Sequence, residues 1–292
     1  MSEILLQAKQ ISKHFGGVTA LDKVDLTIKK GEIHCLMGEN GCGKSTLIKI
    51  ISGFYRPDGG SITFEGKEYD RLSIAESIGL GIQVIYQDMS IFPNLTVAEN
   101  IAINNELYNH RKLVNWKSVK SIAKEALDHI GIELPLQAVV GELSVADKQL
   151  IAIARAILNN SKLIIMDEPT SALTRKEVDK LFKVIRQLQK EGISTLFVSH
   201  KLDEVFEIAD QFTVFRNGKL VVADSAKNIN DEQFVYYMTG RKLEEAAFTP
   251  EKIDHDRAIL KVENLGLTNG FEKISFEIHP GEILGITGLL GY

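Results

Sequence analysis

Cysteine is nearly absent from this sequence of 292 residues, in which Cys35 and Cys42 are the only two. Two cysteines are too few for a disulfide framework, which excludes the class of small disulfide-stapled proteins. The sequence also has no apolar run near the roughly 18 residues that a membrane-spanning helix needs. Its start, MSEILLQAKQ, lacks the basic beginning and the apolar stretch of a secretion signal. We therefore expect a cytoplasmic protein whose role at a membrane, where it has one, comes through a partner.

An excess of positive charge is missing as well. The 34 lysines and arginines stand against 39 aspartates and glutamates, which gives a formal net charge of −5. This balance argues against a strongly basic nucleic-acid-binding chain, although a local basic groove stays open. Hydrophobic residues make up 44% and charged residues 25%, which is ordinary for a globular protein and argues against a disordered or collagen-like chain. The length suits one or two domains with ample core-forming residues.

Short apolar runs alternate with helical patterns along the chain. We expect strands at 4–11, 18–28, 33–37, 82–86, 163–166 and 195–199. Apolar residues at helical spacing predict helices over 47–51 and 116–130, and a capping box at 174–177 predicts the start of another. The dipeptide Asn217-Gly218 between two apolar runs predicts a β-hairpin. Strands that alternate with helices indicate an α/β fold with a largely parallel sheet, and the texture of about 95–160 indicates a mostly helical subdomain.

The end of the sequence repeats its beginning. KISFEIHPGEILGITGLLGY resembles KVDLTIKKGEIHCLMGENGC at a constant offset, with Lys273 placed 250 positions after Lys23. In this register Gly288 and Gly291 match two glycines of a glycine-rich motif near the start of the chain. We therefore expect a domain over 1–240, a linker over 241–258 and, over 259–292, the start of a second and incomplete copy of that domain.

That glycine-rich motif follows the apolar run 33–37. Its sequence, GENGCGKS, fits the phosphate-binding pattern G-x-x-x-x-G-K-[ST], with a predicted strand before it and a predicted helix after it. Glycines let the backbone wrap a phosphate, and successive N–H groups at a helix amino terminus attract the anion. We expect Lys44 to reach the β and γ phosphates and Ser45 to ligate Mg²⁺. The predicted nucleotide-binding residues here are Gly38, Glu39, Asn40, Gly41, Cys42, Gly43, Lys44, Ser45 and Thr46.

The thiol of Cys42 lies inside this motif. A helix amino terminus lowers the pKa of a nearby cysteine and makes it sensitive to alkylation, which is one expectation for Cys42. An inert small residue is the equally open alternative.

Two acidic residues end the apolar run LIIM at 163–166. Such a strand places Asp167 and Glu168 at the carboxyl edge of the sheet, beside the phosphate loop. The carboxylate of Asp167 is suited to bind Mg²⁺ through a water molecule. Hydrolysis needs an oriented nucleophile, and Glu168 is placed to polarise the attacking water. Alone, an Asp-Glu pair often only caps a turn, so the expectation depends on the phosphate loop.

With these two motifs the chain resembles an ATP-binding-cassette (ABC) ATPase. Further motifs occur in the family's order: Gln87 resembles the Q-loop glutamine, LSVAD at 143–147 stands at the signature motif, SALT at 171–174 resembles the D-loop, and His200 resembles the switch histidine. The resemblance implies that Gln87 contacts Mg²⁺ near a transmembrane partner and that His200 lies at the γ phosphate. It also implies that Phe15 stacks on adenine. The implied fold is a P-loop NTPase cassette with an antiparallel β subdomain and a helical subdomain.

The closer resemblance is to ATPase subunits of carbohydrate importers of the ribose, galactose and xylose type, in which two cassettes lie in one polypeptide. It is carried by GENGCGKSTLIKIISG, YQDMSIFPNLTVAENI, MDEPTSALT and the ending YYMTGR. It implies ATP and Mg²⁺ as cofactors, permease subunits as partners, a separate sugar-binding protein, and a peripheral place on the cytoplasmic face of the membrane. No nucleic acid is expected.

The signature motif departs from the family pattern. The family has glycine where Ala146 stands, and a methyl group there is expected to hold off the phosphate of an opposing cassette and to weaken closure. Ser144 is expected to cap the following helix and to contact the nucleotide of that cassette. We expect Ala146→Gly to raise turnover.

The family mechanism sandwiches ATP between two cassettes, and the second is incomplete in this sequence. The chain is therefore expected to self-dimerise, to pair with a separate second half, or to be a fragment that binds ATP without hydrolysing it. A soluble ABC ATPase of DNA repair or translation is the rival enzyme. No long coiled-coil heptads separate Lys44 from Asp167, which argues against the repair type, and no long basic helical arm follows Gly240, which argues against the translation type.

Overall fold

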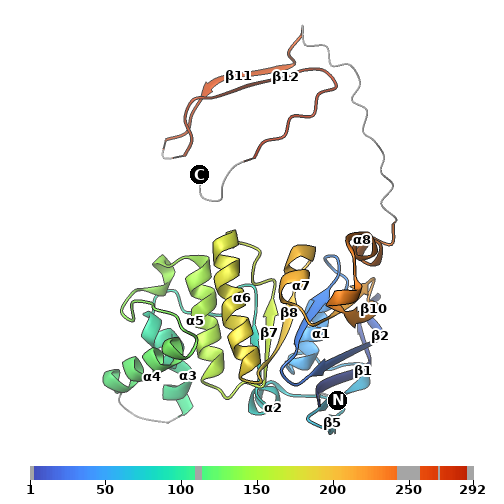
Figure 1. Cartoon of the computed structure of the whole chain (residues 1–292), viewed down its shortest axis with the longest axis vertical. Helices are drawn as coiled ribbons and strands as arrows, with labels where there is room; N and C mark the ends of the chain where they lie inside the picture. The colour runs from blue at the N-terminus through green and yellow to red at the C-terminus, as the bar shows by residue number, and fades with distance from the viewer. Residues whose placement is uncertain (1–2, 109–113, 242–256, 269, 288–292) are drawn as a thin grey trace. The chain divides into compact units, whose positions relative to one another are not determined.

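The computed structural model of the chain describes residues 3–108, 114–241, 257–268 and 270–287. The chain divides into two units, Met1–Leu243 and Glu244–Tyr292, which are described separately (Figure 1). Most of the expected linker and the positions Gly288 and Gly291 lie outside the described residues.

A six-stranded sheet forms the centre of the first unit. Five strands are parallel, and the edge strand β10 runs antiparallel to its neighbour. In spatial order the strands are β10 (Lys219–Ser225), β9 (Gln211–Arg216), β3 (Ile33–Met37), β8 (Ser194–Val198), β7 (Leu163–Asp167) and β6 (Ile82–Ile85). The predicted parallel sheet is confirmed. Short continuous apolar runs predicted it, because the strands of a parallel sheet are buried on both faces. The hairpin predicted at Asn217-Gly218 is also confirmed, since it joins β9 to β10.

A second sheet of four antiparallel strands packs beside the first. Its spatial order is β2 (Val18–Lys29), β1 (Ile4–Phe15), β4 (Gly59–Phe64) and β5 (Lys67–Tyr69). Leu6, Ala8 and Ile28 are fully buried along one face, while intervening residues are exposed or half-buried, which is the alternation of a sheet with one face on a core. The sequence predicted the first two strands but not β4 and β5.

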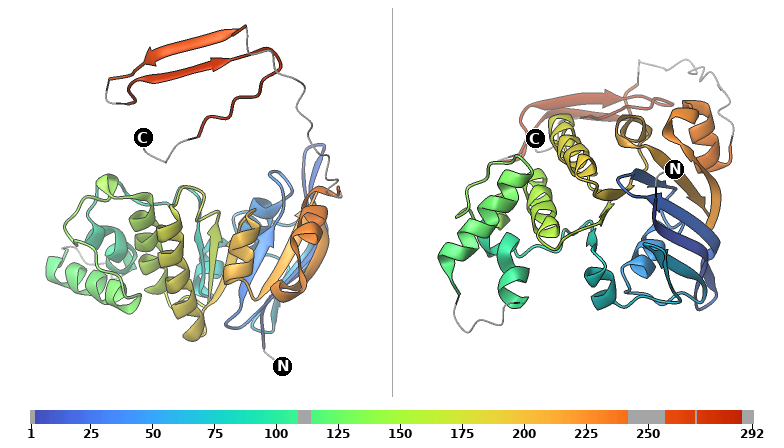
Figure 2. Two further views of the ribbon diagram at one scale, coloured as in Figure 1. Left: turned by 45° about the horizontal axis from the view of Figure 1, so that its top comes forward. Right: turned by 60° about the horizontal axis from the view of Figure 1, so that its bottom comes forward.

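Helices lie on both faces of the central sheet. The α-helices are α1 (Lys44–Ile51), α2 (Ile74–Gly79), α3 (Val97–Tyr108), α4 (Trp116–His129), α5 (Val145–Ile157), α6 (Arg175–Lys190), α7 (Leu202–Ile208) and α8 (Asp231–Thr239), with single 3₁₀ turns at η1 (Val140–Glu142) and η2 (Ala226–Asn228). Helices α5 and α6 cover the face opposite the antiparallel strands, and α1 lies on the same side as those strands (Figures 1 and 2). The predicted capping box stands at the start of α6, where the Glu177 carboxylate accepts from the backbone N–H and from the hydroxyl of Thr174, both at 2.8 Å.

Side chains that alternate along the central strands enter two different cores. Ile164, Met166 and Phe197 pack with α5 and α6, whereas Ile165 and Val198 pack with α1 and the antiparallel sheet. The strand ends are therefore fixed from both faces, and they hold in place the loops that follow them. Among the described residues, no helix is long and apolar enough to cross a membrane.

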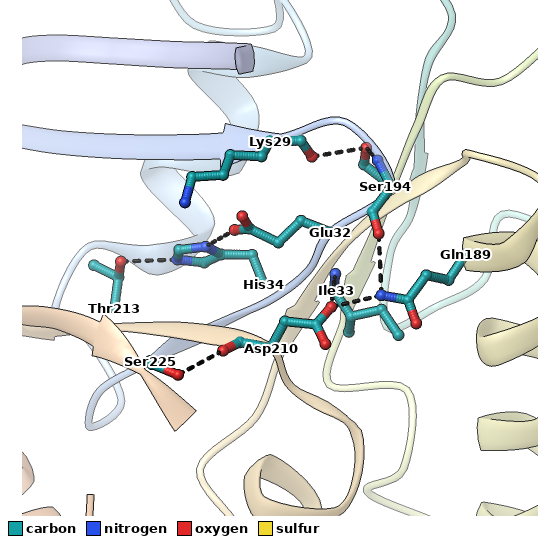
Figure 3. A network of polar contacts seen from close by, with 10 residues as sticks. Lys29, Glu32, Ile33, His34, Gln189, Ser194, Asp210, Thr213 and Ser225 are labelled. Carbon is teal, nitrogen blue, oxygen red and sulfur yellow. Dashed lines mark hydrogen bonds and ion pairs between the residues drawn. The ribbon is translucent and has the colours of Figure 1, made fainter. Parts of the chain in front are cut away.

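A polar network, buried at Glu32, His34 and Thr213 and partly exposed at Asp210, lies at the amino ends of the central strands (Figure 3). His34 lies between a carboxylate and a hydroxyl, with Glu32 Oε1 2.7 Å from Nδ1 and Thr213 Oγ1 2.8 Å from Nε2. Asp210 accepts from the backbone N–H of Ile33 at 2.9 Å and from the Gln189 side chain at 2.5 Å. These bonds join β3, β9 and α6. They fix the amino end of β3, which is the end opposite the phosphate loop.

The second unit contains one antiparallel hairpin, β11 (Leu260–Leu265) with β12 (Ile274–Ile278). Its pairs Leu260↔Ile278, Val262↔Phe276 and Leu265↔Ile274 have the chemistry and order of Leu6↔Ile28, Ala8↔Leu26 and Ile11↔Val24 in the first unit. Both hairpins shift register before the third pair, at a residue with φ of 50°, Gln10 in one and Asn264 in the other. Within the described residues, Ile11 on this face of the first unit is 0% exposed, whereas Leu265 at the matching position of the second unit is 48% exposed.

Candidate functional site

The glycine-rich motif forms the turn between β3 and α1. Gly38, Gly41 and Gly43 have φ of 148°, 80° and 108°, in the region that side chains other than glycine rarely adopt. A Cβ on Gly38 would lie 2.3 Å from the carbonyl oxygen of Phe215, and one on Gly43 would lie 2.6 Å from that of Ala20. The neighbouring backbone therefore requires glycine at these two positions. The turn ends at the first residue of α1, so the free N–H groups of that helix face the loop.

Lys44 is buried inside this turn. Its side chain is held by the loop itself, because Nζ donates to the carbonyl oxygens of Gly38 at 2.6 Å and of Glu39 at 3.0 Å. Only 6% of the residue is exposed. The loop thus keeps a positive charge at the point where a phosphate is expected to bind.

A cavity of about 580 Å³ opens over the turn. It joins the phosphate loop to three side chains from distant parts of the sequence, Gln87, Asp167 and Glu168. Gln87 follows β6, Asp167 ends β7 and Glu168 comes directly after it, and these parallel strands are neighbours in the sheet. The expected meeting of the acidic strand end with the phosphate loop is therefore present in the structure. The loop residues that line the cavity are Asn40, Gly41, Gly43, Lys44, Ser45 and Thr46.

Asp167 stands opposite the first turn of α1. Its Oδ2 accepts a hydrogen bond of 3.4 Å from the Ser45 hydroxyl. Burial, followed by the negative charge of Glu168, raises the pKa of the Asp167 carboxyl. An adjacent hydroxyl and carboxylate are hard oxygen ligands of the kind that Mg²⁺ prefers. The residues present therefore fit the expected Mg²⁺ site of Ser45, Gln87 and Asp167.

Glu168 and His200 come together from two neighbouring strand ends. His200 Nδ1 lies 3.5 Å from Glu168 Oε1. Glu168 has a φ of 50°, an uncommon conformation for a residue with a side chain, and its backbone N–H donates to Val198 O at 3.2 Å. Strained backbone of this kind is concentrated at functional sites. Glu168 lines the cavity, whereas the half-exposed His200 contacts Glu168 without contributing to the lining.

Phe15 and Ser144 lie apart from this cavity. The ring of Phe15 is 41% exposed and meets Tyr55 edge-on at 5.2 Å, while the cavity reaches the chain three residues later, at Val18. Ser144 caps α5, where its hydroxyl accepts from Asp147 N at 3.1 Å. The predicted cap is confirmed, and neither residue contributes to the cavity lining.

The expectation of a low pKa for Cys42 is wrong. The residue is 4% exposed, and burial raises the pKa of its thiol more than the nearby Lys44 lowers it. Burial also outweighs the backbone N–H groups of Cys42 and Lys44, which lower the pKa of this thiol. The thiol packs with the core beneath the loop as a small apolar group.

Two short segments complete the cavity wall, and sequence reasoning did not find them. Residues 18–20 at the start of β2 and the Asn217-Gly218 turn both line the cavity. The turn is bonded into place, with Gly218 N donating to Cys42 O at 3.1 Å and Asp22 N donating to Gly218 O at 2.8 Å. The hairpin was visible in the sequence, but its position beside the phosphate loop depends on contacts between residues nearly 200 positions apart.

A second groove, of about 610 Å³, adjoins the cavity on the side of Gln87. It shares Ser45, Gln87 and Asp167 with the cavity and is further lined by Lys49, Phe54, Tyr86 and Asp88. Phe54 is 58% exposed, and the Lys49 ammonium lies 6.0 Å from the centre of its ring. A partner bound in this groove would contact the residues around the nucleotide cavity directly.

The parallel sheet and the phosphate loop that leads into α1 define a nucleotide-binding protein of the P-loop class. Residues 21–171 match the family model described as ABC transporter. The chain belongs to the ABC transporter family, and its fold is that of the ATP-binding cassette.

Individual relatives agree with this assignment. The chain is 44% identical, over 98% of its length, to a putative ribose/galactose/methyl galactoside import ATP-binding protein of Halalkalibacterium halodurans. It spans only 55% of that relative's length. Among solved structures it is similar to an ATP-binding cassette of an ABC transporter in its ADP conformation, with a TM-score of 0.70, 28% identity, and coverage of 80% of this chain and 94% of that one. A dimeric cassette bound to ADP and Pi is also similar, with a TM-score of 0.66, 25% identity, and coverage of 77% and 100%.

Proposed function

We propose that this chain is the ATP-binding and ATP-hydrolysing part of an importer for a monosaccharide or a related sugar. The cavity that joins the phosphate loop to Gln87, Asp167 and Glu168 is the observation that carries the proposal. The sugar is inferred from the relative, which is named for import of ribose, galactose and methyl galactoside. ATP is the substrate, and binding and cleavage of its terminal phosphate move a membrane permease between its states.

The residues of the cavity have separate roles in this proposal. Lys44 and the N–H groups at the start of α1 bind the phosphates. Ser45, Asp167 and Gln87 would hold Mg²⁺, which supplies neutralisation of phosphate charge when bound. Glu168 orients the attacking water and accepts its proton. His200 stabilises the carboxylate of Glu168 and contacts the γ phosphate from the edge of the cavity. Phe15 stacks on the adenine ring, outside the part of the cavity that residues 18–20 line.

A second cassette completes the site. Ser144 begins α5 away from this chain's own cavity, so its expected contact with nucleotide requires the cavity of another cassette. The similarity to a dimeric cassette bound to ADP and Pi supports such an arrangement. We propose that two cassettes face each other with ATP between them, each with Ser144 at the other's phosphates.

The permease is the proposed partner at the groove beside Gln87. Lys49 and the exposed ring of Phe54 offer a cation and an apolar surface to a polypeptide segment. In this assembly the chain is peripheral, on the cytoplasmic face of the membrane, and a separate sugar-binding protein delivers the sugar to the permease. The net charge of −5 supports the expectation that nucleic acid is not a partner.

The second unit is proposed to be the start of a second cassette. The shared register of the two hairpins and the repeated sequence around Gly281 support this reading. On this basis 1–240 is the first cassette with a helical subdomain at about 95–160, 241–258 is the linker and 259–292 begins the second.

Binding and hydrolysis of ATP by variants test the proposal. Lys44→Met is expected to weaken ATP binding by at least about tenfold in calorimetric titration, because the ammonium contact with phosphate is lost. Glu168→Gln is expected to bind ATP about as tightly as the parent chain and to release no phosphate above background. Equal ATP affinity in the parent chain and Lys44→Met would contradict the assigned site. Co-purification with ribosomes or DNA instead of a membrane permease would contradict the transport function.

A further inference from the structure

Glu168 and His200 stand on two different loops, the β7–α6 loop and the β8–α7 loop. Neither side chain is held firmly by the other, since their closest approach is 3.5 Å and the His200 side chain is 51% exposed. Their alignment therefore depends on how the two loops are held relative to each other.

Beneath His200, the residues on either side of it are tied to a buried carboxylate. Ser199 Oγ donates to Glu204 Oε2 at 2.5 Å and accepts from the backbone N–H of Lys201 at 3.0 Å. Ser199 is 3% exposed and Glu204 is 4% exposed. A buried carboxylate needs compensating partners, so these bonds hold the β8–α7 loop against the first turn of α7.

Lys201 extends this arrangement to the other loop. Its Nζ lies 3.1 Å from Glu204 Oε1 and donates to the carbonyl oxygen of Thr170 at 3.1 Å. Thr170 is 2% exposed and lies two residues after Glu168, so its carbonyl is a fixed point on the β7–α6 loop. Lys201, a residue of the β8–α7 loop, therefore bonds the β7–α6 loop and the first turn of α7 through one ammonium group.

We propose that Lys201, held by Glu204 and Ser199, is a positioning residue that sets the alignment of Glu168 with His200. This inference rests on the proposed function, in which these two groups act on the attacking water and the γ phosphate. Lys201 itself does not line the nucleotide cavity. Its loss is expected to lower the rate of hydrolysis and to leave ATP affinity nearly unchanged, because the phosphate loop lies on other elements.

The test compares Lys201→Met with Lys201→Arg and with Lys183→Met. Lys183 is an exposed lysine of α6 with no ion pair in the part of the chain that the structure describes, which makes it a matched control. Misplacement of reacting groups by about 1 Å costs on the order of 100-fold in rate. We expect Lys201→Met to lower kcat at least about tenfold, with KM for ATP within about twofold, at a temperature where the variant is fully folded. Its melting temperature should fall, because the buried carboxylate of Glu204 loses a compensating partner. Lys201→Arg keeps the positive charge and is expected to retain most of the parent kcat. The control Lys183→Met is expected to retain all of it.

Glu204→Gln provides a second variant of similar shape. The amide oxygen can still accept from Ser199, but the attraction for Lys201 is lost, so kcat is expected to fall less than in Lys201→Met. A parent-like kcat in Lys201→Met would overturn the proposal. So would equal losses in Lys201→Met and Lys201→Arg accompanied by weaker ATP binding, since that pattern indicates general damage to the fold.

Amide hydrogen exchange separates this proposal from the proposed function. If the parent chain binds ATP but releases no phosphate even at protein concentrations at which chains pair, the hydrolytic part of the proposed function fails, and the link between the loops is still measurable. Lys201→Met is then expected to speed exchange in peptides that cover 168–173 as well as in those that cover 199–205. Faster exchange confined to 199–205 would show that the lysine does not hold the other loop, and would overturn the inference.

Discussion

At the scale of single residues, the ionised carboxylate of Asp167 lowers the stability of the folded protein. Burial and the neighbouring charge of Glu168 raise the pKa of its carboxyl above the value in an unfolded chain, about 3.9. The folded chain then binds this proton more tightly than the unfolded chain does. Stability therefore falls as the pH rises from the unfolded pKa through the folded pKa, and the ionised carboxylate destabilises the nucleotide-free protein at neutral pH.

Asp167→Asn is expected to remove that cost and to damage function. Without nucleotide and Mg²⁺, the variant should melt at a higher temperature than the parent chain at pH 7, and its stability should fall less between pH 4 and pH 7. Phosphate release should drop by about 100-fold, as for the loss of one strong electrostatic contact in an active site. Thermal unfolding as a function of pH measures the first effect. A lower melting temperature for the variant at pH 7 would contradict the account.

At the scale of elements, the amino end of α5 shows where sequence reasoning and structure diverge. The sequence suggested that the methyl group of Ala146 holds off an opposing phosphate. In the structure Ala146 is 6% exposed and packs in the core with the helices, whereas Val145, one position earlier, is 39% exposed. The buried methyl group does not stand on the surface that an opposing cassette would meet, so the structure gives a reason against the effect first expected.

Ala146→Gly is accordingly expected to lower stability without raising turnover. Glycine in a helix costs about 0.5–1 kcal/mol relative to alanine, and the variant also loses a buried methyl group. Urea unfolding monitored by circular dichroism measures the loss. Val145→Ala is the informative comparison, because it changes the exposed residue of the same turn. A rise in turnover for Ala146→Gly at unchanged stability would restore the earlier expectation.

Other elements show which features local sequence predicts. The run of five apolar residues 33–37 matches β3 at both ends, because a buried parallel strand is apolar at every position. The proximity of His200 to Glu168 had no local signal and was expected only from the family resemblance, since the two residues follow strands that are separated by α6. The left-handed conformation of Glu168 and the wall formed by residues 18–20 and the Asn217-Gly218 turn had no local signal, because both depend on tertiary packing.

At the scale of the whole molecule, we propose that the chain contains one cassette and the beginning of a second. Across eight curated relatives it spans 55% to 59% of their length. The cavity of the first unit lacks Ser144, which the proposed mechanism takes from a second cassette. Hydrolysis is therefore predicted to require association of two cassettes, and a single cassette is predicted to bind ATP without cleaving it.

Phosphate release by the purified chain, measured over a wide range of protein concentration at saturating ATP and Mg²⁺, tests this central claim most directly. The account predicts that the rate per chain rises with concentration as chains pair, and that Glu168→Gln releases no phosphate at any concentration. A rate per chain that does not change with concentration, or turnover that persists in Glu168→Gln, would contradict it.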